Sequence, residues 1–267
     1  MRVDLLIKDL DAVVAFSRAM RSPLEGPLPI ELKYLSSWQA VIRRAQDGAA
    51  DVTVVQADFP PDDSARGTWM LRLKQLTSVV PAGGVVPYVC RSDSSGSVLS
   101  AIRHVGFPLL IVQGVDDDAH SLLRILARAR GLREINRRLR SAGNDRPDQS
   151  FHMVLSALLG WPAAHSVSEL AHRLHVSDRT LQRRLRNLGL PSPGRMIHWA
   201  RVIEAEALCR MGLRSRMKLA SVLGLRDPRS LPRLYQECMG EPLGERLRAA
   251  EKGRSEAVSA FLSAISG

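Results

Sequence analysis

Two patterns of apolar and polar positions alternate along the first 125 residues. Short apolar or β-branched runs are typical of buried strands, and segments with apolar residues at helical spacing separate them. We expect strands at residues 3–7, 30–35, 51–57, 85–90 and 109–112. We expect helices at 11–20, at 37–46 with Ser37 as N-cap, at 69–76, and from a cap at Asp117 or Asp118 towards Leu139. This alternation predicts a doubly wound parallel sheet.

The chain after residue 150 has helical periodicity throughout, and it repeats itself. Residues 141–150 (SAGNDRPDQS) are rich in turn formers and mark the expected domain boundary. The pattern Ala171-x-x-Leu174 recurs 49 positions later as Ala220-x-x-Leu223. Two copies of one supersecondary unit predict a paired module.

The first copy has the signals of a helix-turn-helix unit. Ser166 and Glu169 form a capping box that opens a helix, which breaks near His175. Ser177 then caps a second helix. The buried face of that helix holds Leu181, Leu185 and Leu188, and the exposed face holds Arg179, Gln182, Arg183 and Arg186. Arg and Gln donate paired hydrogen bonds to guanine and adenine in the major groove, so this face favours DNA contact. The alternative is a solvated, arginine-rich helix face on an ordinary helical bundle.

The second copy follows the same plan with one departure. Asp227 is the expected N-cap, and Pro228 takes the first helical position, where proline is tolerated. Arg229 and Arg233 lie on the exposed face. Pro232 falls inside the expected helix, where proline removes a hydrogen bond, so the helix either begins later or is kinked.

Residues 194–211 form the expected helix between the two copies. A helix of about 18 residues spans about 27 Å. Successive major grooves on one face of DNA lie about 34 Å apart, so such a helix can hold two units close to one DNA turn apart.

The net charge of +11 is unevenly distributed. Residues 1–123 hold 12 Lys and Arg against 14 Asp and Glu, residues 124–146 hold 8 against 2, and residues 148–267 hold 18 against 11. This asymmetry indicates nucleic acid or another anionic surface contacting one part of the chain. A generally arginine-rich surface is the alternative. For residues 124–146, phosphate contacts and a solvated helix face are both open.

Several functional classes are excluded. Cys90, Cys209 and Cys238 are too few and too scattered for a disulfide framework or a Cys-rich zinc site, and they indicate a reducing compartment. Acidic residues within the first 16 positions argue against a secretory signal, and no apolar run has the roughly 18–20 residues of a membrane helix. His172 and His175 have no third ligand nearby, and common catalytic motifs are missing. We expect a cytoplasmic protein, not an enzyme, with no catalytic, cofactor or metal site and no membrane partner.

Three stretches of the C-terminal part have a known counterpart. They are LAHRLHVSDRTLQRRLRNLG, the linker signature Arg201-x-x-Glu204-Ala205-x-x-Leu208, and LASVLGLRDPRSLPRLYQECMGEPLGERL. Together they make residues 151–249 resemble the DNA-binding domain of the AraC/XylS family of bacterial transcription regulators. The resemblance implies that the second helix of each unit enters the major groove. The positions that match the family's base-contacting residues are Arg179, Gln182 and Arg183, then Pro228, Arg229, Pro232 and Arg233.

The N-terminal part is similar to a response-regulator receiver domain without its acidic chemistry. Lys8-Asp9 stands where a receiver has an acidic pair, Gln56 stands at the phosphoacceptor position, and no Lys follows the strand at 109–112. Without the carboxylate cluster there is no Mg²⁺ site and no nucleophile. Asp58 is an alternative phosphoacceptor, although a loop carboxylate is the favoured interpretation. We expect a degenerate receiver that signals without phosphorylation; an unrelated α/β sensory domain is the alternative.

These observations predict four parts: a receiver-like α/β domain at 1–125, an arginine-rich connecting helix and linker at 126–150, an all-α double helix-turn-helix domain at 151–250, and a tail at 251–267. The expected function is sequence-specific transcription regulation on double-stranded DNA. The expected contacts are Arg179, Gln182, Arg183, Arg186, Arg229 and Arg233. The alternative is a signalling interaction protein whose helical domain no longer recognises DNA specifically. A homodimer through the N-terminal domain or the connecting helix is open, and the effector is unknown.

Overall fold

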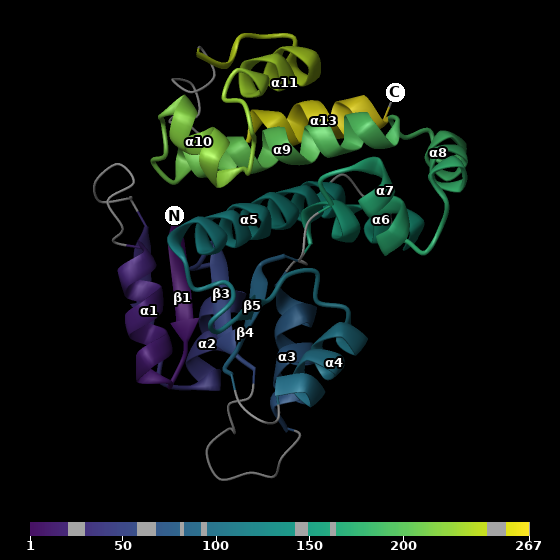
Figure 1. Cartoon of the computed structure of the whole chain (residues 1–267). Helices are drawn as coiled ribbons and strands as arrows, with labels where there is room; N and C mark the ends of the chain where they lie inside the picture. The colour runs from purple at the N-terminus through teal and green to yellow at the C-terminus, as the bar shows by residue number, and fades with distance from the viewer. Residues whose placement is uncertain are drawn as a thin grey trace. The chain divides into compact units, whose positions relative to one another are not determined.

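The computed structural model describes residues 1–20, 30–57, 68–80, 83–91, 95–141, 149–160, 164–244 and 255–266. The chain divides into two compact units, Met1–Arg133 and Glu134–Gly267. The division falls inside the helix that is labelled α5 in Figure 1. Within the described ranges, no helix combines the length and the hydrophobicity needed to cross a membrane.

Unit 1 contains a five-stranded, fully parallel sheet. Its strands are β1 (Arg2–Leu6), β2 (Glu31–Tyr34), β3 (Val52–Gln56), β4 (Val85–Val89) and β5 (Ile111–Val112). They are arranged in the order β2-β1-β3-β4-β5, which is a doubly wound topology. The central strand β3 is buried at all five residues, as an apolar run covered on both faces requires. The predicted doubly wound sheet is therefore confirmed.

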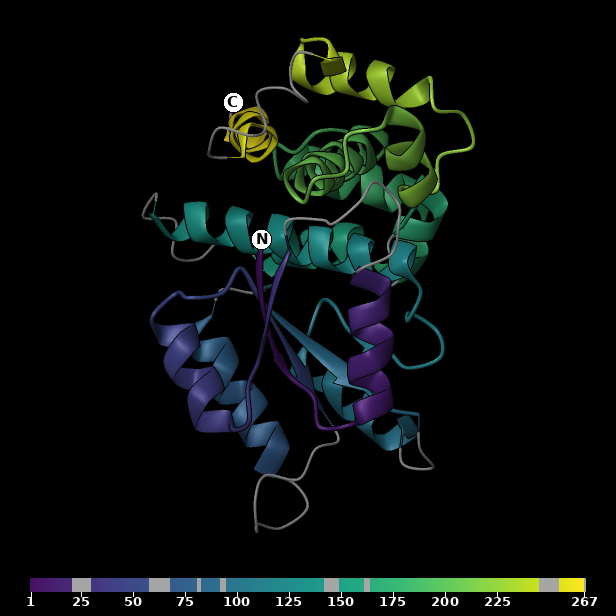
Figure 2. The same ribbon diagram turned by 90° about the vertical axis from the view of Figure 1, so that its left-hand side faces the viewer.

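Helices connect the strands of unit 1. They are α1 (Leu10–Met20), α2 (Trp38–Gln46), α3 (Thr68–Val79), α4 (Ser95–Val105) and α5 (Ala119–Ser141). Figure 2 shows α1 on one face of the sheet and α2 with α3 on the other. The predicted caps are confirmed: the Ala40 N–H donates to Ser37 Oγ at 3.2 Å, and the Ser121 N–H donates to Asp118 Oδ1 at 3.0 Å. Helix α4 has no counterpart among the expected elements.

Helix α5 meets the rest of unit 1 where the strands begin. Gly83 lies just before β4, and a Cβ added to it would stand 2.4 Å from the Cβ of Leu132. Arg133 also donates a hydrogen bond to the carbonyl of Ala50, just before β3. Glycine therefore permits a close approach that any side chain would block.

A buried ion pair connects β1 to α2. Asp4 is 1% exposed, and its carboxylate accepts two hydrogen bonds from Arg44, at 2.8 Å from Nε and 2.9 Å from Nη2. This paired geometry raises the pKa of Arg44, chiefly through the hydrogen bond to Asp4. A charge in a sheet core requires such a partner.

Unit 2 is entirely helical beyond α5 in its described residues. It contains α6 (Gln149–Leu159), α7 (Val167–Arg173), α8 (Asp178–Asn187), α9 (Pro193–Arg210), α10 (Arg216–Val222), α11 (Ser230–Met239) and α13 (Glu256–Ser266). Helix α9 is central and contacts all six of the others. The pairs α7–α8 and α10–α11 lie where the sequence predicts the two helix-turn-helix units.

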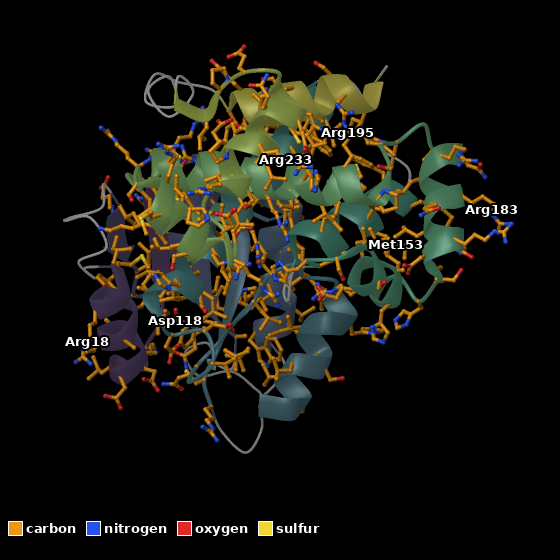
Figure 3. All side chains as sticks on the ribbon, turned by 45° about the horizontal axis from the view of Figure 1, so that its top comes forward. Arg18, Asp118, Met153, Arg183, Arg195 and Arg233 are labelled. Carbon is orange, nitrogen blue, oxygen red and sulfur yellow. The ribbon has the colours of Figure 1, made fainter. Side chains whose placement is uncertain are left out.

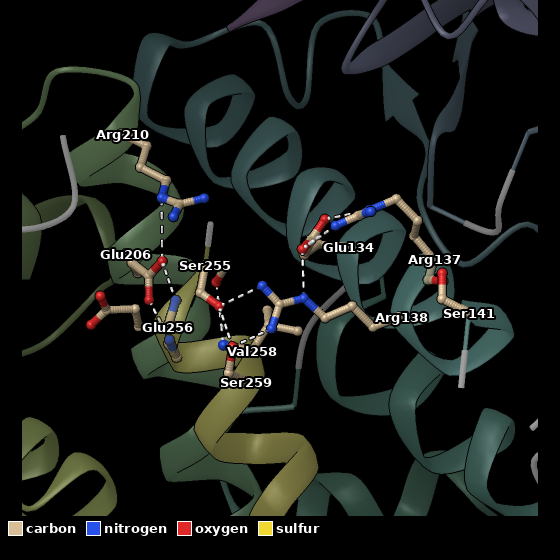
Figure 4. Close-up of polar contacts among 11 residues, drawn as sticks. Glu134, Arg137, Arg138, Ser141, Glu206, Arg210, Ser255, Glu256, Val258 and Ser259 are labelled. Carbon is tan, nitrogen blue, oxygen red and sulfur yellow. Dashed lines mark hydrogen bonds and ion pairs between the residues drawn. The ribbon is translucent and has the colours of Figure 1, made fainter. Parts of the chain in front are cut away.

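The residues expected as a C-terminal tail contain helix α13, which packs on α9 and α11. Its N-terminus is held by Glu206 of α9, whose carboxylate accepts from the N–H groups of Glu256 at 3.2 Å and Ala257 at 2.5 Å (Figure 4). Ser255 Oγ accepts from the Val258 N–H at 3.2 Å. The first three N–H groups of the helix thus have acceptors, which an isolated helix lacks.

Candidate nucleic-acid interface

The turn that follows the first helix has the same hydrogen bond in both helix-turn-helix units. In the first, the Val176 N–H donates to the carbonyl of Ala171 at 3.0 Å. In the second, the Leu225 N–H donates to the carbonyl of Ala220 at 2.8 Å. Both bonds close a Schellman turn at the end of the first helix, 49 residues apart. The sequence repeat is therefore a structural repeat.

The residue that reverses the chain differs between the two turns. His175 has a φ of 52°, in the left-handed region, and Gly224 at the matching position has a φ of 67°. Glycine adopts this conformation readily, whereas a non-glycine residue is strained there. The turn of the first unit therefore contains backbone strain at His175, which glycine at position 224 avoids in the second unit.

Local signals fix where the second helix of the first unit begins and how it is rotated. Ser177 caps α8, and its Oγ accepts from the Thr180 N–H at 3.2 Å. Leu181 and Leu185 are both 1% exposed, so they fix one face of α8 against the unit. The cap at Ser177 and the burial of Leu181 and Leu185 are therefore confirmed, whereas Leu188, expected on the same buried face, is the C-cap residue and only partly buried.

The opposite face of α8 is exposed to solvent. It presents the four donors that the sequence singles out, which are Arg179, Gln182, Arg183 and Arg186. Figure 3 shows Arg183 projecting away from the ribbon. Among the described residues, these four side chains make no hydrogen bond or ion pair. They form a cluster of cationic and amide donors that is free to meet an external acceptor; we call it the α8 donor face.

The second unit begins its second helix later than expected. Helix α11 begins at Ser230, with Arg229 in the N-cap position but without a side-chain capping bond there. Asp227 caps the turn that precedes the helix: its Oδ1 accepts from the Arg229 N–H at 2.9 Å, and its carbonyl accepts from the Ser230 N–H at 3.0 Å. Pro232 becomes the third helical residue, where an N–H has no intrahelical partner. The later start removes the conflict that proline posed.

Arg233 on α11 is exposed like the α8 donors, but it has a partner. Its Nε donates to Glu237 Oε1 at 2.8 Å, while Glu237 Oε2 lies 3.2 Å from His198 Nδ1 on α9. The hydrogen bond from Arg233 is the main cause of the lowered pKa of Glu237. Arg229, in contrast, is exposed at the start of α11. The second unit therefore offers fewer free donors than the first.

The helix between the two units has the predicted length. Helix α9 contains 18 residues, which corresponds to about 27 Å at the standard rise. Glu204, Ala205 and Leu208 of the linker signature are buried in it. Arg201 donates to the carbonyl of His165 at 3.2 Å, so it ties α9 to the segment before α7. Three signature residues therefore belong to the buried part of unit 2, and the fourth, Arg201, attaches α9 to the segment before α7.

The arginines of α5 are engaged in the fold. Arg128 is 4% exposed. Arg137 and Arg138 lie 2.8 and 2.6 Å from Glu134 Oε1, and Arg138 also donates to the carbonyl of Ser255 at 2.9 Å (Figure 4). Burial raises the pKa of Glu134, but the two arginines outweigh it and lower the pKa overall. Much of the positive charge of this helix is therefore structural.

The described residues at the carboxyl ends of β1 and β3 form no acidic cluster. Gln56 Oε1 accepts from the N–H groups of Lys8 at 2.9 Å and Asp9 at 3.2 Å. Asp9 Oδ1 in turn accepts from the Ala12 N–H at 2.8 Å, at the start of α1. The side chains of Gln56 and Asp9 therefore stabilise the segment after β1 by accepting hydrogen bonds from its backbone. Asp58 and the other loop residues after β3 lie outside the described residues.

Strand β4, which neighbours β3 in the sheet, has a buried tyrosine near its end. Tyr88 is 1% exposed, and its hydroxyl donates to Asp117 Oδ1 at 3.3 Å. Burial, followed by the charge of Asp117, raises the pKa of Tyr88 far above its usual range. Within the described ranges, no three His, Cys, Asp or Glu side chains are grouped so that they could hold a metal ion.

Cys238 on α11 is only partly buried, so its reactivity matters. Burial raises the pKa of its thiol to about 11. The thiol is therefore protonated at neutral pH, which makes it a weak nucleophile.

Of the comparisons with known proteins, only the one with solved structures finds matches. No protein-family model matches the chain, and no curated protein matches it. One similar solved structure is RcsB from Salmonella enterica serovar Typhimurium bound to promoter rprA in the presence of phosphomimetic BeF3⁻. It has 15% identity and a TM-score of 0.37, over 74% of this chain and 98% of that chain. Another is an RcsB response regulator from Salmonella typhimurium, with 14% identity and a TM-score of 0.34, over 74% of this chain and 97% of that chain.

Proposed function

We propose that this chain is a transcription regulator that binds double-stranded DNA through two helix-turn-helix units. The observation on which the proposal depends is the α8 donor face, a row of exposed donors with no protein partner on the second helix of such a unit. Arg and Gln are the side chains that form paired hydrogen bonds with guanine and adenine. The resemblance to AraC/XylS regulators points to the same residues.

The two units have unequal roles in this proposal. The first supplies most of the base contacts through Arg179, Gln182, Arg183 and Arg186. The second contributes Arg229 and Arg233, and Glu237 competes with DNA for Arg233. It therefore acts more on the phosphate backbone, where contacts position a protein without specifying sequence. The length of α9 supports placement of the two units in adjacent major grooves.

Unit 1 modulates DNA binding without being phosphorylated in this proposal. Gln56 takes the phosphoacceptor position and is hydrogen-bonded to the backbone after β1. Self-association or an effector of unknown chemistry would supply the signal.

Substitution of Arg183 tests the DNA-binding role. The preferred site is first selected from random duplexes, and affinity is then measured by fluorescence anisotropy. Arg183→Ala is expected to cost about 1–3 kcal/mol on that site and to relax the preference at one base pair. Arg184→Ala is the matched control, because Arg184 lies on the same helix outside the donor face and should change affinity much less.

Two results would contradict this proposal. One is the absence of binding to any duplex at low salt. The other is binding that is steep in salt but unaffected in sequence preference by Arg183→Ala, which would favour the signalling interaction protein.

Treatment with acetyl phosphate tests the role of unit 1. Intact-mass spectrometry is expected to show no added phosphoryl group, because the position at the end of β3 holds an amide instead of a carboxylate nucleophile. A phosphoryl group mapped to Asp9 or Asp58 would overturn this part of the proposal. A receiver with an intact acidic pair, treated in the same way, is the positive control.

A further inference from the structure

Unit 1 has an apolar surface patch that its own fold does not cover. Leu10 and Val14 of α1 are 77% and 50% exposed, and Tyr34 at the end of the edge strand β2 is 47% exposed. The hydroxyl groups of Tyr34 and Ser17 are hydrogen-bonded to each other, so the helix and the strand edge form one continuous surface. We call Leu10, Val14, Ser17 and Tyr34 the α1 face.

The rotation of α1 accounts for this exposure. Ala12, Phe16 and Met20 follow each other at intervals of four residues and are buried against unit 1. Leu10 and Val14 lie on the other side of the same helix, also four residues apart. Helix α1 therefore has two apolar sides, and only one of them has a partner in the described chain.

One acidic and one basic residue of α1 flank the patch. Asp11 and Arg18 are exposed, and they are seven residues apart, so they lie on one flank of α1, two turns from each other. Figure 3 shows Arg18 on the outer side of the helix. The midpoint between them falls beside Val14. In an antiparallel pair of α1 helices related by a twofold axis at that point, each Asp11 faces the other copy's Arg18.

We propose that the α1 face is a docking surface for a second copy of this chain. The two α1 helices pack antiparallel, with Val14 of both copies in the centre, Leu10 of each copy farther from the axis, and two reciprocal pairs between Asp11 and Arg18 at the edge. A twofold interface must be self-complementary in this way. Its small apolar area is typical of a weak, transient contact, so association is expected at micromolar concentration. The inference names the surface for the self-association included in the proposed function, and it depends on unit 1 alone.

Charge reversal tests the pairing directly. Sedimentation equilibrium of the full chain without DNA is expected to show a monomer–dimer equilibrium. Asp11→Arg and Arg18→Asp each create two like-charge contacts and should weaken the dimer about tenfold or more. The double variant reverses both charges and should restore association. Mixing the two single variants should produce a heterodimer. One copy is then positive at positions 11 and 18 and the other is negative at both, so every contact between them is attractive.

The mixing experiment separates recognition from folding damage, since a folding defect in either variant cannot create attraction between them. Leu10→Asp should abolish association, whereas Leu71→Asp, at a 66% exposed position on α3, should leave it unchanged. The proposal fails if the wild-type chain stays monomeric up to about 100 µM. It also fails if the mixture associates no more than the separate variants. DNA affinity is read in a different assay, so loss of one property without the other identifies which proposal is wrong.

Discussion

Asp4 and Arg44 show how one buried charge sets the tolerance of unit 1 to mutation. The side chain of Asp4 is 2% exposed and that of Arg44 is 23% exposed. Removal of one partner therefore leaves the other in a different environment in each case. Without Arg44, the carboxylate is left in the core, whereas without Asp4 the guanidinium can turn towards water.

We predict unequal costs for the two substitutions. Arg44→Leu should lower the free energy of unfolding by about 3–5 kcal/mol, because it leaves Asp4 buried and unpaired. Asp4→Leu should cost about 1–2 kcal/mol, because Arg44 retains access to solvent. Urea unfolding of both variants, followed by circular dichroism, measures the difference. Equal or reversed costs would show that the pair is not held as described.

At the scale of elements, α13 depends on a contact far away in the chain. Glu206 is 7% exposed and lies 3.3 Å from Arg210, so its charge is balanced while it accepts from the first turn of α13. The carboxylate also lies at the positive end of the helix dipole, which favours it. The position of this helix is thus encoded 50 residues before its start.

Glu206→Ala should lower the free energy of unfolding of unit 2 by about 2–3 kcal/mol, because two N–H groups lose their acceptor. Glu206→Gln keeps one oxygen and should cost less. Amide hydrogen exchange should show that protection is lost first in α13. Ser263→Ala, at an exposed position on the same helix, is the control, and equal loss of protection in this variant would contradict the capping role.

Which elements could be predicted from the sequence depends on where their signals lie. Helix α8 was predictable because its cap, Ser177, and its buried Leu181 and Leu185 are local. The start of α11 was not, because Asp227 and Pro228 imitate a helix start that the structure uses as a turn. Helix α13 is hard to recognise in the sequence because its partner, Glu206, lies 50 residues before its start.

At the scale of the whole molecule, net charge alone was a poor guide to the interface. The excess of +6 in residues 124–146 left open whether this stretch contacts phosphates. In the structure, Arg133, Arg137 and Arg138 bind a carbonyl or a carboxylate within their own unit. The arginines of α8 are different, because the described residues offer their side chains no hydrogen-bond or ion-pair partner. Periodicity identified that face, but only the structure separates free arginines from engaged ones.

The contrast between the free arginines of α8 and the engaged Arg233 has a thermodynamic consequence. A mobile arginine side chain carries about 2 kcal/mol of rotamer entropy at 25 °C, which it loses when a base or phosphate immobilises it. Arg233 has already lost part of that freedom to Glu237. In the proposed complex with DNA, the α8 donors therefore have this rotamer entropy still to lose, whereas Arg233 starts from a side-chain position already set by Glu237. In the proposed complex with DNA, contacts of the first unit are therefore opposed by entropy, and the contact of Arg233 is opposed by the exchange of Glu237 for a new partner.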